Sequence, residues 1–63
     1  MNRNEAYKAM ERGYKVTHTF FSDDEYLYIT DGRMYSEEGY RFEEGWEMRK
    51  GGYWEEGWSY YKE

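Results

Sequence analysis

Six residues between positions 46 and 58 combine flat aromatic rings with positive charges. Indole and phenol rings can stack on a nucleobase, and lysine or arginine can pair with phosphate. A nucleotide-like ligand suits this mixture, and we therefore predict a non-catalytic ligand-binding site in this segment. The predicted site residues are Trp46, Arg49, Lys50, Tyr53, Trp54 and Trp58.

The same residue types allow two other interpretations. The tryptophans can form the core of a small aromatic domain, or they can form a protein interface, because Trp, Tyr and Arg dominate binding hot spots. A chain this small can also bury its tryptophans between identical subunits and form pockets at those seams. We therefore expect a homo-oligomer.

A second group of residues is acidic and offers a different chemistry. The chain carries 14 Asp and Glu against 9 Lys and Arg, a net charge of −5, and most of the excess lies beyond residue 21. Such a charge disfavours binding to a nucleic-acid duplex, which relies on positive side chains. An acidic surface can instead mimic a nucleic-acid backbone and bind a basic site on a nuclease or other effector. Alternatively, the acidic residues can simply form a solvated surface. The candidate partner-binding residues are Asp23, Asp24, Glu25, Glu37 and Glu38.

Catalytic and metal-binding signatures are weak in this sequence. His18 is the only histidine and the chain has no cysteine, so a zinc site of the usual kind lacks ligands. We expect His18 to be a hydrogen-bonded strand residue. Paired glutamates in a turn are not held across a cleft as glycosidase carboxylates are. We therefore expect no enzyme activity, no metal and no cofactor.

Length and composition limit the architecture. The chain has 63 residues, which predicts one domain over residues 1–63. Aromatic residues make up 24% of the chain, whereas Leu, Ile and Val occur once each, so rings must build the interior. The sequence has no long apolar run, so we expect no membrane span and no signal peptide. We expect a cytoplasmic protein.

The first third of the sequence predicts a helix followed by a strand. Asn2 is a suitable N-cap with Glu5 as its reciprocal partner, and Gly13 can end a helix over residues 3–12. Apolar residues at helical spacing predict a buried face. These inward residues are Ala6, Met10, and also Tyr7 and Ala9. Residues 14–21 alternate as a strand does, with Tyr14, Val16, His18 and Phe20 on one face.

The remaining residues predict short elements joined by glycine turns. Asp31-Gly32 favours a two-residue hairpin loop, so residues 26–30 should pair with residues 33–36. We predict further strands at residues 40–42 and 58–61, and one irregular helical turn within residues 43–50. Glu-Glu-Gly followed by an aromatic residue occurs three times, at residues 37–40, 43–46 and 55–58. We interpret this recurrence as loop chemistry, in which glycine supplies a left-handed residue and the aromatic restarts a strand.

The whole chain resembles a set of small bacteriophage accessory proteins. The likeness rests on "NEAYKAMERGYKVTH", the hairpin around Asp31-Gly32, "EEGYRF" and "WEEGWSYY". This set includes the Thoeris anti-defence type 2 family, whose members sequester a cyclic ADP-ribose-type immune signal in pockets of a homo-oligomer. The matching positions are Glu5, Ala6, Ala9, Met10, Gly13, Lys15, Val16, Gly39, Tyr40, Glu56, Trp58 and Tyr61.

This chain also departs from the family it resembles. It is shorter, it has no proline in the loop region, and Gly57 stands where the family often has aspartate. The resemblance implies a phage inhibitor of bacterial antiviral defence that acts by binding a nucleotide-derived signal. The alternative is an acidic protein that binds a defence effector directly. In either case we expect an α+β fold, with an N-terminal helix packed on a small antiparallel sheet of four to five strands.

Overall fold

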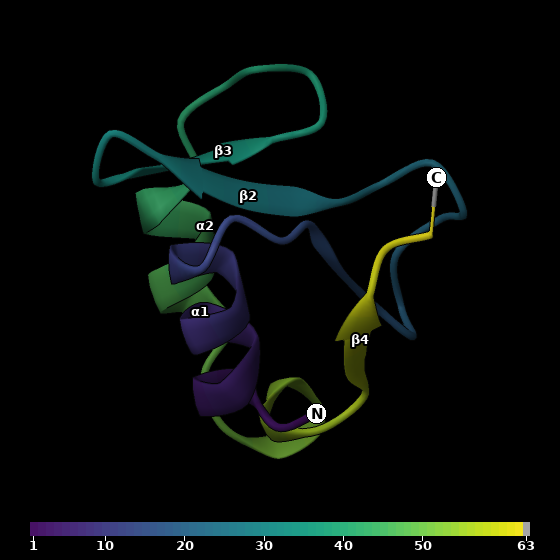
Figure 1. Ribbon diagram of the computed structural model, residues 1–63. Coiled ribbons are helices and arrows are strands. Elements are labelled where there is room, and N and C mark those ends of the chain that lie inside the picture. The colour runs from purple at the N-terminus through teal and green to yellow at the C-terminus, as the bar shows by residue number, and fades with distance from the viewer. Residues whose placement is uncertain (63) are drawn as a thin grey trace.

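The computed structural model describes residues 1–62 and has an N-terminal helix packed on a four-stranded antiparallel sheet. The strand order is β3-β2-β1-β4, and both helices lie on one side of this sheet (Figure 1). The predicted α+β class is confirmed. The elements in chain order are α1 (Arg3–Glu11), β1 (Val16–His18), β2 (Leu27–Thr30), β3 (Arg33–Ser36), α2 (Glu43–Met48), the 3₁₀ helix η1 (Gly52–Glu55) and β4 (Trp58–Tyr60).

Helix α1 begins and ends as its sequence predicts. The Asn2 side chain accepts a hydrogen bond from the Glu5 amide at 2.8 Å, and the Glu5 carboxylate accepts one from the Asn2 amide at 2.9 Å. This reciprocal pair satisfies two donors that would otherwise be orphaned at a helix start. After the helix, Gly13 adopts a φ of +94°. Three of the four predicted inward residues are buried, namely Ala6, Ala9 and Met10, whereas Tyr7 is 39% exposed.

The first strand is shorter than the predicted one over residues 14–21. Tyr14 donates its amide to Ala9 at the end of α1, so it still belongs to the helix exit. On the other side, the Phe21 amide donates to His18 in a tight turn. Strand β1 is therefore only Val16–His18. The Phe20 side chain, which was expected on the same face as Val16 and His18, is 61% exposed.

The β2–β3 hairpin is confirmed as predicted. Asp31 and Gly32 have φ values of +52° and +75°, the two left-handed residues that a type I′ turn requires. Its register pairs Thr30 with Arg33 next to the turn and Leu27 with Ser36 at the far end.

A third short strand at residues 40–42 was predicted, and the structure has only one bridge there, between Tyr35 and Arg41. The chain turns into α2 immediately afterwards. Gly45 lies inside this helix. A β-carbon at that position would meet the Phe42 ring at 2.9 Å, so the packing of this ring favours glycine. The predicted single helical turn within residues 43–50 is thus a longer helix, Glu43–Met48.

The C-terminal part consists of η1 and β4. Gly51 and Gly52 have positive φ values, which agrees with the predicted joint. Strand β4 ends at Tyr60 instead of residue 61, although the Tyr61 amide still donates to Lys15 at 2.9 Å. Within residues 1–62, no helix has the length and apolar character needed to cross a membrane.

The core lies between α1 and the inner face of the sheet. Helix α1 contacts β1, β2 and β4, and α2 contacts β3. Two indoles, Trp46 from α2 and Trp58 from β4, meet in this core with ring centroids 5.0 Å apart. The other buried hydrophobic residues are Ala6, Ala9, Met10, Val16, Leu27 and Met34.

His18 belongs to the same interior. Its Nε2 donates to the Glu56 carbonyl at 2.7 Å, and its Nδ1 accepts the Phe20 amide at 3.0 Å. The ring also lies against Trp54 and Trp58, at centroid distances of 4.5 and 4.7 Å. The prediction of a hydrogen-bonded strand histidine is confirmed.

Candidate functional site

The six residues of the predicted ligand site do not form one accessible patch. Trp46 and Trp58 are only 5% and 2% exposed, so both indoles are core residues in this structure. The physical reason is the shortage of aliphatic side chains, because a core with single Leu, Ile and Val residues must be filled by rings. A ligand could stack on these two indoles only if the core opened.

Of the other four predicted residues, Tyr53, Trp54 and Arg49 lie near one another, whereas Lys50 lies apart from them. Tyr53 is 78% exposed, and Trp54 is half-buried beside it. The Arg49 guanidinium carbon lies 5.1 Å from the centre of the Trp54 ring, and its Nη1 donates to the Gly45 carbonyl at 3.0 Å. Lys50 pairs with Glu47 at 2.8 Å. The two cations therefore do not converge on a shared anion site.

Arg49 is half-buried and held between elements. Its guanidinium also lies over the rings of Phe42 and Phe21, at 5.0 and 6.0 Å. Within the described residues 1–62, its Nε is a buried side-chain nitrogen that has no hydrogen-bond partner. Three rings cover this cation, so it fastens the α2 segment to the loop after β1.

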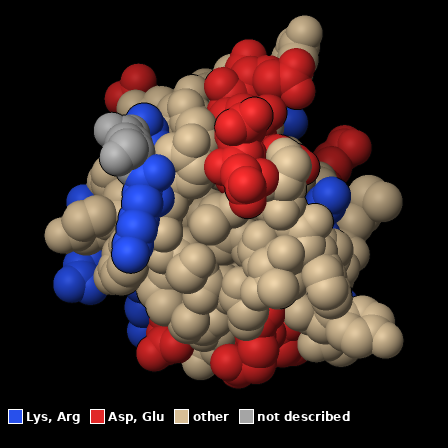
Figure 2. Space-filling model, turned by 90° about the vertical axis from the view of Figure 1, so that its right-hand side faces the viewer, with Lys and Arg blue, Asp and Glu red and all other residues tan. Residues whose placement is uncertain are grey.

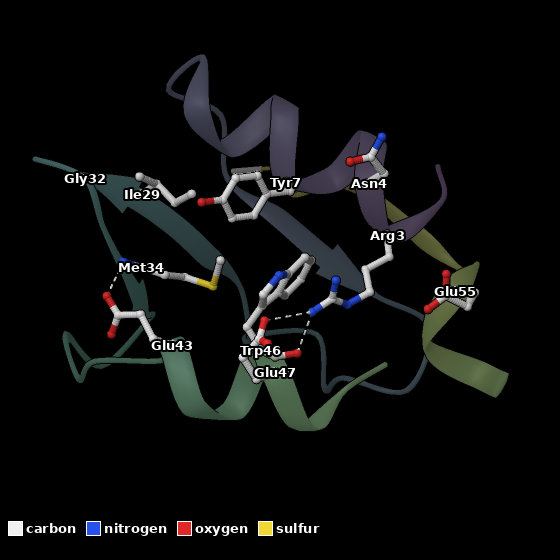
Figure 3. A pocket seen from close by; sticks show the side chains of 10 residues that line it. All are labelled: Arg3, Asn4, Tyr7, Ile29, Gly32, Met34, Glu43, Trp46, Glu47 and Glu55. Carbon is white, nitrogen blue, oxygen red and sulfur yellow. Dashed lines mark hydrogen bonds and ion pairs between the residues drawn. The ribbon is translucent and has the colours of Figure 1, made fainter. Parts of the chain in front are cut away.

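A cleft of about 440 Å³ opens between α1, the hairpin and α2 (Figure 3). The Arg3 guanidinium lies over the Trp46 ring at 4.2 Å and donates to the carbonyls of Trp46 and Arg49 at 2.8 and 2.9 Å. Arg3 thus caps the C-terminal end of α2. Three carboxylates also line the cleft, those of Glu43, Glu47 and Glu55. A phosphate-bearing ligand would meet mostly negative charge there.

The outer face of the sheet holds a second aromatic cluster that the sequence analysis did not single out. Side chains alternate along a strand, so the neighbours of the buried Val16, Leu27 and Met34 point away from the helices. We call this surface the tyrosine face. Its residues are Lys15, Thr17, Tyr26, Tyr28, Thr30, Arg33, Tyr35, Ser59 and Tyr61.

Four tyrosines run across this face in contact with one another. The centroid distances are 5.7 Å from Tyr35 to Tyr28, 6.1 Å from Tyr28 to Tyr26, and 4.5 Å from Tyr26 to Tyr61. All four rings are half-buried, so each is fixed by its neighbours and keeps part of its surface exposed. A row of rings in this state is a surface on which flat ligands can stack.

Positive side chains accompany the tyrosines. The Lys15 Nζ lies 4.8 Å from the centre of the Tyr26 ring, and Arg33 is exposed beside the hairpin turn. Arg41 lies opposite Tyr35 through the β-bridge, while its Nε also pairs with Glu43 at 2.8 Å. None of the nine residues of the tyrosine face is acidic, although the chain as a whole carries a net charge of −5.

The β1–β4 end of this face is hollowed. A depression of about 660 Å³ lies between this end and the loop after β1, and its lining residues include Thr17, Ser59, Tyr61 and Lys62 as well as the acidic Asp23. This volume falls in the range of about 300–1,000 Å³ that is typical of small-molecule sites. Figure 2 views the molecule from the side of β4, and shows positive side chains mainly along the left edge, and negative ones at the bottom and in a patch that reaches from the top toward the centre. The surface between these groups carries few charges.

The acidic residues of the alternative site come from two loops at the same end of the hairpin. Leu27 pairs with Ser36, so the loop before β2 and the loop after β3 leave the same end of the hairpin. The hydrogen bond from the Ser22 amide to Glu25, at 2.9 Å, lowers the pKa of that carboxyl. These loops hold Asp23, Asp24 and Glu25, and Glu37 and Glu38, respectively.

One signal in the sequence could have found the tyrosine face. Tyr26 and Tyr28 are spaced by two on either side of Leu27, as are Lys15 and Thr17 around Val16. With Leu27 and Val16 assigned to the core, this alternation predicts tyrosine and lysine on the opposite face. Comparison with known proteins adds no further guide, because the chain matches no family model, no curated protein and no solved structure.

Proposed function

We propose that this protein is a non-catalytic binding protein that sequesters a nucleotide-derived signal on its tyrosine face. The observation that supports this proposal is the row of four contacting tyrosines with positive side chains around it. Bases stack on aromatic rings with about 1–3 kcal/mol each, and lysine or arginine meets the phosphate. In the cleft of Figure 3, the one cation among the described lining residues, Arg3, already donates to two carbonyls, and three carboxylates line the same space.

The biological setting of the proposal comes from the resemblance to phage accessory proteins. A phage protein that removes an immune signal would block bacterial antiviral defence without chemistry, and it would act in the cytoplasm of the host. A homo-oligomer is part of the proposal, because two copies of an open face can enclose a ligand that one copy leaves exposed.

Ligand retention tests this function directly. The purified protein is incubated with cyclic ADP-ribose, ADP-ribose or AMP, separated from free ligand by filtration, and then heated to release what it holds. We expect at least one of these compounds to be retained and recovered unchanged. Retention of none of them would remove the proposed function, and recovery of an altered compound would indicate an enzyme.

A matched pair of variants locates the site in the same assay. Tyr28→Ala together with Tyr35→Ala removes two rings from the tyrosine face, whereas Tyr53→Ala removes an exposed ring elsewhere. We expect the double variant to lose most of the retained ligand and Tyr53→Ala to keep it. The reverse result would return the site to the segment around Trp54.

The acidic loops support a second candidate function, inhibition of a defence effector by direct contact. The observation in its favour is the pairing of Leu27 with Ser36, which places two acidic loops at the same end of the hairpin. A chain that retains no nucleotide, yet protects phage in infected cells, would favour this candidate. Reversing the charges of Asp24 and Glu38 should then abolish protection without changing the fold, because both side chains are exposed.

A further inference from the structure

The row of rings on the tyrosine face is longer than one base can use. It begins at Tyr35 on β3, continues through Tyr28 and Tyr26 on the β2 side, and ends at Tyr61 beside β4. The four rings are separated by three centroid distances of 5.7, 6.1 and 4.5 Å, so the row extends well beyond a single nucleobase. Only a ligand with several bases can cover it.

The positive side chains are also spread along the row. Arg33 and Arg41 lie at its β3 end, Lys15 lies near its middle, and Lys62 lies at its β4 end. A mononucleotide carries its phosphates at one point and would need a single cluster of cations. A charge at each end and one between them instead matches a ligand whose phosphates recur along its length.

We propose that the occupant of the tyrosine face is a linear single-stranded nucleic acid of several nucleotides. The strand lies across the sheet from β3 to β4, with bases stacked on the tyrosines and phosphates toward the cations. This inference rests on the proposed function, because it assigns the ligand class of the same face.

A duplex does not fit this face. Paired bases are stacked on one another and cannot turn toward aromatic side chains, whereas unpaired bases can. The negative charge on the rest of the molecule, including the acidic loops beside Leu27 and Ser36, would also repel the second strand. Both the shape of the face and the charge of the protein therefore favour a single-stranded ligand.

Length dependence of binding tests the inference. Thymidine monophosphate and oligothymidylates of two, four and eight nucleotides compete with a fluorescent octathymidylate in an anisotropy assay, and a hairpin duplex serves as the paired control. We expect affinity to rise at least about tenfold from the monophosphate to the tetranucleotide, and to fall with added salt. The duplex should compete poorly.

The outcomes separate the inference from the function that it rests on. If thymidine monophosphate competes as well as the octanucleotide, the inference is overturned and the proposed function stands. If the protein binds neither oligonucleotides nor the nucleotides of the retention assay, both are overturned. Stronger competition by the duplex would also contradict the single-strand assignment.

Variants of the full chain show whether the oligonucleotide lies on this face. Tyr28→Ala and Arg33→Glu should each weaken octathymidylate binding about tenfold, because one removes a stacking ring and the other reverses a charge. Tyr28→Phe should bind nearly as the unchanged protein does. The matched controls are Tyr53→Ala and Lys50→Glu, which lie outside the face. Equal losses in variants and controls, with circular dichroism showing every variant folded, would overturn the placement.

Discussion

Glu43 is the side chain that joins the hairpin to α2. Its Oε2 accepts the Met34 amide at 3.0 Å and its Oε1 accepts a hydrogen bond from Arg41 at 2.8 Å. These two bonds, the one from Arg41 first, lower the pKa of Glu43 below its ordinary value of 4.5. The ionised carboxylate is thus bound more favourably in the folded chain than in the unfolded chain.

This pKa shift predicts how stability responds to acid. A carboxyl whose pKa is lowered by folding contributes stability that is complete above its ordinary pKa and is lost as the pH falls through the lowered value. We expect Glu43→Gln to destabilise the protein at pH 7, and the difference from the unchanged protein to shrink in strong acid. Thermal unfolding at several pH values measures this, with Glu44→Gln as the control in the same helical turn. A constant difference at every pH would contradict it.

The three Glu-Glu-Gly runs show that one sequence pattern serves different elements. Gly39 and Gly57 have φ values of +84° and +90°, which agrees with the predicted left-handed glycine. Gly45 is different, because it lies within α2 and leaves room for the Phe42 ring. The prediction of loop chemistry for residues 43–46 was therefore wrong. The helical turn predicted within residues 43–50 describes this run better than loop chemistry does.

The turn before β4 is the element whose glycine is most constrained. Its own backbone is left-handed, and a β-carbon on Gly57 would also meet Thr19 Oγ1 at 3.0 Å and His18 Nε2 at 3.1 Å. At Gly39 the backbone is equally left-handed, but there is nothing within 4 Å of such a carbon. Substitutions at these two positions therefore distinguish the effect of backbone strain from that of steric crowding.

Alanine at each position tests this distinction. Gly39→Ala should cost about 1–2 kcal/mol of unfolding free energy, because a left-handed residue with a β-carbon is strained. Gly57→Ala should cost clearly more, because it adds the crowding at His18 and Thr19. Chemical denaturation of both variants provides the comparison. Equal losses would show that the β4 turn relaxes at no cost.

Most elements of the fold follow from local residues, whereas the site depends on how the elements meet. The capping pair of Asn2 and Glu5 and the Asp31-Gly32 turn act over a few residues, so the sequence predicts them well. The ends of β1 are set by hydrogen bonds to Ala9 and His18 that the strand pattern does not contain. The local sequence pattern therefore predicts the type of each element better than the residues at which it ends.

At the scale of the whole molecule, burial decides which rings are available to a ligand. The sequence places tryptophan and arginine within a short segment, but it does not show that Trp46 and Trp58 are needed to fill the core. The tyrosines are far apart in sequence, between positions 26 and 61, and only the sheet brings them together. This division of rings between core and surface is the basis of the proposed site.

A nuclear magnetic resonance titration with octathymidylate tests this division most directly. The account predicts that the ring signals of Tyr28, Tyr35 and Tyr61 shift together as the ligand is added, while those of Tyr53 and Trp54 stay in place. Shifts confined to Tyr53 and Trp54, or to Tyr7 in the cleft of Figure 3, would contradict the account.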